Sequence, residues 1–383
     1  MKNWVQLAGL PNRDCACYDF FLYCLREIRR ANASESRDKV FAALGYLKRS
    51  LPANAECKIE THYSITVEEV YTRAATVLLQ ELPDLALLSE VEDPSLKRID
   101  KLPSWVPDFS VSMVESILGS SEPDQYNASN CKREHALKPD RSQVIGSRLR
   151  LHGFLVDTVT EIQTLPAAYS RLDVAEVAES ALKDMVRSWF DLLERTKSSA
   201  YKTSWLETLW RTLIVNKCNP AGSPPITDET FHDLFLYFIT MGGRDFMPGV
   251  SKSISQGPCW PTNETIQDHS ETLQRCRLLY PDEADTGKLA KVTANFMRMS
   301  GAISLTGALR AFTTRNGWLG MGPKSIQQGD QVWLIDGARM VFALRPKAED
   351  EPLTLIGETY LHGVMNGEMA EEVRNSMQSV FIA

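Results

Sequence analysis

The stretch from Arg310 to Glu368 constrains the fold most, because short apolar runs alternate there with turn signals. The strongest signal is Asp336-Gly337, since both central positions of a two-residue type I′ turn need positive φ. It separates two apolar runs, residues 331–335 and 339–344, which we predict to be paired strands. A glycine-rich turn is predicted over residues 320–323 and a third strand over 353–360. Short strands at this spacing favour a small barrel or a strongly bent antiparallel sheet.

The rest of the chain is predicted to be mainly helical. The clearest helix is expected over Tyr63–Leu88, with Ser64 or Thr66 as its N-cap and acidic residues in its first turn. Pro83 either ends this helix or begins a second short helix at Asp84. Residues 143–162 alternate between apolar and polar side chains, which is typical of strands. The predicted fold class is therefore α+β: a helical body with a small antiparallel β segment, joined to a C-terminal β-barrel-like unit.

These elements predict three parts. Residues 1–305 form the mainly helical body, which includes the strands at about 143–162. Residues 306–370 form the C-terminal β unit, and residues 371–383 form a tail.

Three runs together resemble one family. They are SRDKVFAALG at residues 36–45, LPSWVPDFS at 102–110, and GWLGMGP followed by IGETYLHGVMNGE within 317–368. Their order resembles that of fungal heterokaryon-incompatibility (HET-domain) proteins, from about residue 26 onward. In that family the HET domain mostly precedes the first run, and here only 35 residues do so. The resemblance therefore implies the region downstream of the HET domain, with the N-terminal HET module mostly missing.

Charge and composition exclude several kinds of partner. The formal net charge is −7 and no basic patch dominates, so we expect neither nucleic acid nor an anionic membrane as a partner. No run approaches the roughly 20 apolar residues of a membrane-spanning helix, and no signal peptide is evident. The eight cysteines are scattered, as expected of reduced thiols. We predict a cytoplasmic protein.

The sequence carries no common catalytic or cofactor motif. It lacks a dinucleotide-binding glycine fingerprint, a phosphate-binding loop, a nucleophile elbow and paired zinc ligands, so we predict no cofactor and no metal site. One cluster of candidate catalytic residues remains: Glu358, Tyr360, His362 and Glu368. In a strand the first three would share one face, where they could transfer protons. The alternative is that the cluster stabilises the end of the strand by hydrogen bonds.

Two functions stay open. The resemblance implies a truncated or divergent HET-family protein that acts through protein interaction in nonself recognition or its regulation. The alternative is a motif-poor enzyme of the cyclase or isomerase type, using acid–base chemistry in a fungal secondary-metabolite pathway, since a shaped pocket with a few polar groups leaves no motif. The expected partner is accordingly another protein or a small-molecule substrate. Enzyme status and oligomeric state are left open.

Overall fold

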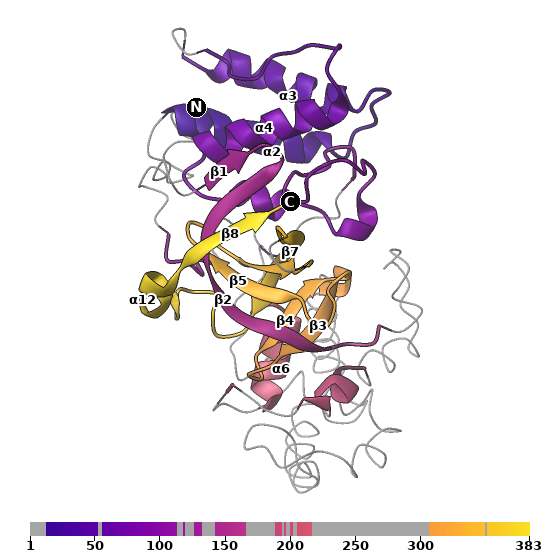
Figure 1. Cartoon of the computed structure of the whole chain (residues 1–383). Helices are drawn as coiled ribbons and strands as arrows, with labels where there is room; N and C mark the ends of the chain where they lie inside the picture. Colours follow the sequence, from indigo (N-terminus) through magenta and orange to yellow (C-terminus); the bar gives the residue numbers. More distant parts are fainter. Residues whose placement is uncertain are drawn as a thin grey trace, which may run out of the picture. The chain divides into compact units, whose positions relative to one another are not determined.

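The computed structural model describes residues 13–52, 56–112, 118, 126–131, 142–165, 188–193, 195, 196, 200, 201, 205–216, 306–348 and 351–383 (Figure 1). The chain divides into two compact units, and each is made of separate stretches of sequence. The first unit comprises residues 1–156, 329–359 and 363–383. The second comprises residues 157–328 and 360–362. Residues 217–305 of the predicted helical body lie outside the described residues.

Three α-helices of the first unit pack on one another: α2 (Arg13–Ile28), α3 (Arg37–Ser50) and α4 (Val67–Glu81). Helix α4 begins with a capping box between Thr66 and Glu69, which confirms Thr66 as the predicted N-cap. The helix begins later than the predicted Tyr63, and it ends before Pro83, as one of the two alternatives predicted. Ser64 instead hydrogen-bonds to Nδ1 of His62 at 2.6 Å, and Leu82 is extended because Pro83 follows it.

The first unit also holds short helices and most of the strands. The short helices are η1 (Ala86–Glu90), η2 (Pro94–Leu96), α12 (Ala370–Val373) and η5 (Arg374–Ser376). The start of the long strand β2 (Arg148–Ile162) is paired antiparallel with β1 (Ser142–Ile145) and with β8 (Gln378–Ile382), which runs beside it in Figure 1. Strands β1 and β2 confirm the antiparallel segment predicted at about 143–162. The stretch 371–383 thus contains η5 and strand β8.

Strands β5 (Gln331–Ile335) and β6 (Val341–Arg345) form the predicted antiparallel pair, but the predicted two-residue turn is wrong. Only Gly337 has positive φ, at 84°, and the connection runs through residues 336–340. Backbone N–H groups of other segments stabilise this longer loop. Leu85 donates to the carbonyl of Gly337 at 3.1 Å, and Ala128 donates to that of Arg339 at 2.9 Å. The loop's carbonyls are therefore bonded to other parts of the unit, as buried backbone groups require.

The second unit contains the end of β2, β3 (Leu309–Thr314), β4 (Leu319–Pro323), the last residues of β7 (Thr354–Leu361), α6 (Trp205–Leu213) and η4 (Thr306–Ala308). The predicted turn over residues 320–323 is wrong, because this run is strand β4 and pairs with β3. The turn lies before it, where Gly317 has φ of 83°. Glycine is needed at position 320 for another reason, which is that Phe312 packs directly against its backbone. A Cβ at this position would lie 2.4 Å from Cζ of Phe312.

The order of neighbouring strands in the sheet differs from their order in the sequence. Strand β2 pairs with β3, β3 with β4, β4 with β7, β7 with β6, and β6 with β5, which pairs with β2 again. All the pairings with a given register are antiparallel. Together with the helices, this arrangement confirms the predicted α+β class with C-terminal strands.

Candidate functional site

The first sequence run, residues 36–45, joins three helices. Lys39 is 6% exposed, and its ammonium donates to the carbonyls of Ile28 at 3.0 Å and Arg29 at 3.2 Å, and also to that of Ala31. It therefore satisfies the free carbonyls at the end of α2. Arg37 donates to the carbonyl of Ile65 at 3.0 Å, just before α4. The residues of this run are thus engaged in building a helix junction.

The second run, residues 102–110, contacts a buried ion pair through the backbone of Asp108. Arg29 is 2% exposed, and its Nη2 donates to Oε2 of Glu92 at 2.9 Å and to the carbonyl of Asp108 at 2.9 Å. Its other nitrogens donate to the carbonyls of Glu90 and Val111. Burial raises the pKa of Glu92, while the positive charge of Arg29 acts to lower it. The guanidinium thus ties α2 to the second run.

The carboxylate of Asp108 organises the same run. It is completely buried, and its two oxygens accept hydrogen bonds from the backbone of Arg98, Ile99 and Ser110 and from the hydroxyl of Ser110. Trp105 is also completely buried, and its indole N–H donates to the carbonyl of Ser147 at 2.9 Å. These contacts give the run a structural role in the first unit.

The structure brings two candidate catalytic residues together in the second unit. The hydroxyl of Tyr360 lies 3.0 Å from Nδ1 of His362, at the end of β7. Tyr360 is 2% exposed, whereas His362 is half-buried. The backbone N–H of His362 donates to the carbonyl of Leu319 at 3.0 Å, which extends the pairing of β7 with β4. The phenol can donate to the imidazole when Nδ1 carries no proton.

Tyr201 is a third member of this pair, which the sequence reasoning missed. Its hydroxyl accepts the N–H of Leu319 at 2.8 Å and lies 3.1 Å from the carbonyl of His362. Its ring centroid lies 5.3 Å from that of His362 and 5.6 Å from that of Trp318. Burial raises the pKa of Tyr201, so its hydroxyl stays protonated as a donor. No local pattern signals a contact between residues 161 positions apart.

The two candidate glutamates have other surroundings, both in the first unit. Glu358 is 9% exposed, and its charge acts on Arg26 of α2. Glu368 is exposed and accepts hydrogen bonds from the backbone N–H of Asn366 at 2.7 Å and from its side-chain amide at 3.1 Å. Glu368 therefore closes a local turn. The pair that can exchange a proton directly is Tyr360 and His362.

The C-terminal strands lie in a region that is similar to a known domain. Residues 280–381 match the Het-6 β-barrel domain. The chain is also 24% identical, over 370 residues, to heterokaryon incompatibility protein 6, OR allele, of Neurospora crassa. That alignment covers 88% of this chain and 49% of the relative, so the chain spans about half the length of the curated protein it matches. No solved structure matches the chain.

The fold and these matches define a protein that carries a Het-6 β-barrel domain. The chain is similar to a fungal heterokaryon incompatibility protein, as the sequence resemblance predicted.

Two kinds of feature are absent from the described part of the chain. None of its helices is both long and apolar enough to cross a membrane. Among the same residues, no group of three or more His, Cys, Asp and Glu side chains is placed to hold a metal ion.

Proposed function

We propose that this protein takes part in fungal nonself recognition, or in its regulation, by binding another protein in the cytoplasm. The observation that carries the proposal is the alignment of 88% of the chain with a heterokaryon incompatibility protein. Two of the three sequence runs that carry the resemblance build the first unit itself, which supports a similarity that extends to the framework of that unit.

A protein-binding role is further supported by the outer face of strands β1, β2 and β8. Directly opposed residues of antiparallel strands lie on the same face. Ile145 opposes Arg148, and Phe381 opposes Arg150. Ile145 is 48% exposed and Phe381 is 40% exposed. Neither arginine makes an ion pair with another described residue. This basic and apolar face suits a partner segment with acidic and apolar side chains.

The test is a fusion assay between two fungal strains that differ only in the allele of this gene. We expect the fused cells to grow poorly when the alleles differ and normally when they match. The double substitution Ile145→Thr and Phe381→Ser should restore growth to the level of matched strains, because it removes the apolar part of the face. Tyr46→Ser is the matched control, since Tyr46 is 53% exposed on α3. Normal growth of every wild-type pairing would refute the proposed function, and double variants behaving like wild type would exclude this face.

A second candidate function is acid–base catalysis in a secondary-metabolite pathway, which the hydrogen bond between Tyr360 and His362 favours. On this proposal, His362→Gln abolishes one metabolite and lets its precursor accumulate, while the melting temperature stays close to that of wild type. The control is His152→Gln, since His152 also lies on a strand and contacts a hydroxyl, that of Ser379 at 3.4 Å. If His362→Gln lowers the melting temperature and the metabolite persists, the pair is structural.

A further inference from the structure

Strand β1 is an open edge of the sheet in the first unit. It stands at one end of the strand order and pairs with β2 on one side. Among the described residues, no backbone hydrogen bond reaches its other side. An edge strand presents unpaired N–H and C=O groups to which a strand of another chain can bind.

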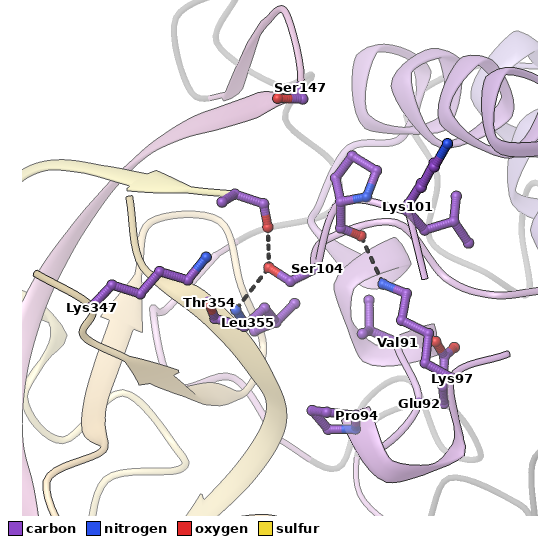
Figure 2. Close-up of a pocket in the computed structure, with 13 residues that line it drawn as sticks. Val91, Glu92, Pro94, Lys97, Lys101, Ser104, Ser147, Lys347, Thr354 and Leu355 are labelled. Atoms are coloured by element: carbon purple, nitrogen blue, oxygen red, sulfur yellow. Dashed lines mark hydrogen bonds between the residues drawn. The ribbon is translucent and has the colours of Figure 1, made fainter. Parts of the chain in front are cut away.

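The opposite edge of this part of the sheet is closed. Strand β8 lies on the other side of β2 and is itself covered along its outer edge. Leu353 donates its N–H to the carbonyl of Phe381 at 2.8 Å and accepts the N–H of Ala383 at 2.9 Å. The hydroxyl of Ser104 donates to the carbonyl of Ala383, a bond that is dashed in Figure 2. The edge of these three strands that remains for a new strand is therefore that of β1.

The turn after β1 determines which of its backbone groups are free. Strands β1 and β2 are joined through residues 146 and 147, and Gly146 has φ of 62°, as the first position of a type II′ turn requires. The pair next to such a turn, Ile145 and Arg148, exchanges both backbone hydrogen bonds, and bonded pairs alternate from there. The N–H and C=O groups of Ser142 and Val144 therefore point away from β2.

The two faces of β1 differ in their surroundings. The hydroxyl of Ser142 donates to the carbonyl of Leu79 in α4 at 3.5 Å. Because side chains alternate along a strand, Ser142 and Val144 face α4, and both are half-buried. Gln143 and Ile145 lie on the other face and are exposed. A strand added beside β1 would thus have one row of side chains toward α4 and one row toward solvent.

The solvent-facing row would meet positive charge. Arg150 is directly opposite Gln143, and Arg148 is opposite Ile145, so both arginines share this face. Neither makes an ion pair with another described residue, and the buried Nε of Arg150 has no hydrogen-bond partner. An added strand would lie two strand spacings from β2, about 10 Å, which an arginine and a glutamate side chain can bridge together.

We propose that the edge of β1 binds an extended segment of another protein, which adds to the sheet as an antiparallel strand. In this segment apolar side chains face α4, and acidic side chains alternate with them to face Arg148 and Arg150. Main-chain hydrogen bonds supply affinity in this mode, and the alternating side chains supply specificity. A second copy pairing through its own β1 would bring no carboxylate, because residues 142–145 are Ser-Gln-Val-Ile. The inference rests on the proposed protein-binding role and names the chemistry of the partner.

The test is fluorescence polarisation of the full chain with the labelled peptide Val-Glu-Val-Glu-Val-Glu, capped at both ends. We expect saturable binding, and no saturable binding of the control peptide Val-Lys-Val-Lys-Val-Lys. In the antiparallel arrangement the N–H groups of the valines point toward β1. N-methylation of the valines should therefore abolish binding, whereas N-methylation of the glutamates should leave the affinity close to that of the parent peptide.

Variants of the protein test the same edge from the other side. Val144→Pro removes a free N–H and no bond to β2, as edge strands allow, and should weaken binding at least about tenfold. Val144→Thr is its control, because it keeps the N–H and the β-branched shape. Arg148→Gln and Arg150→Gln should each weaken binding about two- to fivefold, the usual effect of one exposed ion pair. Arg49→Gln, at an exposed position of α3, should leave it unchanged.

Circular dichroism of each variant shows whether the chain still folds. The inference is overturned if the acidic peptide does not bind, or if both N-methylated peptides bind like the parent. It is also overturned if light scattering shows a dimer of the chain that Val144→Pro dissociates, since a second copy then occupies the edge. Poor growth of mismatched fungal strains without peptide binding would remove this inference alone. Peptide binding with normal growth in every pairing would support the edge and refute the role in nonself recognition.

Discussion

Replacing Arg29 by methionine is expected to lower the free energy of unfolding by about 3–5 kcal/mol, the usual cost of breaking a buried ion pair from one side. Arg29 and Glu92 are each 2% exposed, so the carboxylate left behind cannot be solvated by water. The substitution also removes the hydrogen bonds that Arg29 donates to the carbonyls of Glu90, Asp108 and Val111. Urea unfolding followed by circular dichroism measures the change.

Two further variants distinguish the stability lost by breaking the ion pair from the stability lost by removing any arginine. Arg49→Met removes an exposed arginine from α3 and should change stability by less than about 0.5 kcal/mol. Adding Glu92→Gln to Arg29→Met should recover part of the loss, because it removes the unpaired charge. A loss below 1 kcal/mol for Arg29→Met would contradict the buried network.

The loss in Arg29→Met should also depend on pH. Burial already raises the pKa of Glu92 above its ordinary value, and the charge of Arg29 opposes that rise, so removing Arg29 raises this pKa further. A carboxyl whose pKa is higher in the folded chain favours folding at low pH, and this contribution is lost as pH rises from the unfolded pKa, about 4.3, through the folded value. The difference between wild type and variant should therefore be smaller at about pH 5 than at about pH 7.

Gly320→Ala is expected to destabilise the chain by about 3 kcal/mol, at the upper end of the usual cost of overpacking. The new Cβ would lie 2.4 Å from Cζ of Phe312 and 2.6 Å from the carbonyl oxygen of Tyr360. Phe312 is completely buried, and the carbonyl belongs to the pairing of β7 with β4, so neither can move aside cheaply.

The matched control is Gly45→Ala, which makes the same chemical change. Gly45 lies within α3, and a Cβ there meets nothing within 4 Å. That variant should gain about 0.5–1 kcal/mol, since alanine favours a helix over glycine. Equal melting temperatures for the two variants would refute the close packing around Gly320.

The sequence could predict elements whose cause is local. The cap of α4 follows from Thr66 and Glu69 three positions apart, and its end follows from Pro83. The alternation in residues 148–162 predicts a strand because side-chain direction has period two. The resemblance also predicted the relationship to heterokaryon-incompatibility proteins, since its three runs lie in a characteristic order.

Features that depend on contacts between residues far apart in the sequence could not be predicted. Residues 320–323 contain two glycines and a proline, so local propensity favours a turn, yet pairing with β3 makes a strand. The loop after Ile335 is longer than its Asp336-Gly337 pair predicts, because Leu85 and Ala128 bind its carbonyls. The contact of Tyr201 with His362 has the same origin, since it depends on tertiary structure alone.

The discontinuous units have a consequence for synthesis on the ribosome. The hydroxyl of Ser104 bonds to the carbonyl of Ala383, a residue made 279 positions later. Strand β2 is likewise synthesised long before its partner β8, because the ribosome adds only about 5–20 residues per second. The first unit therefore cannot complete its sheet until residues 378–382 emerge, and the nascent chain exposes unpaired strand edges for many seconds. Such an order of assembly makes the growing chain a natural client for chaperones.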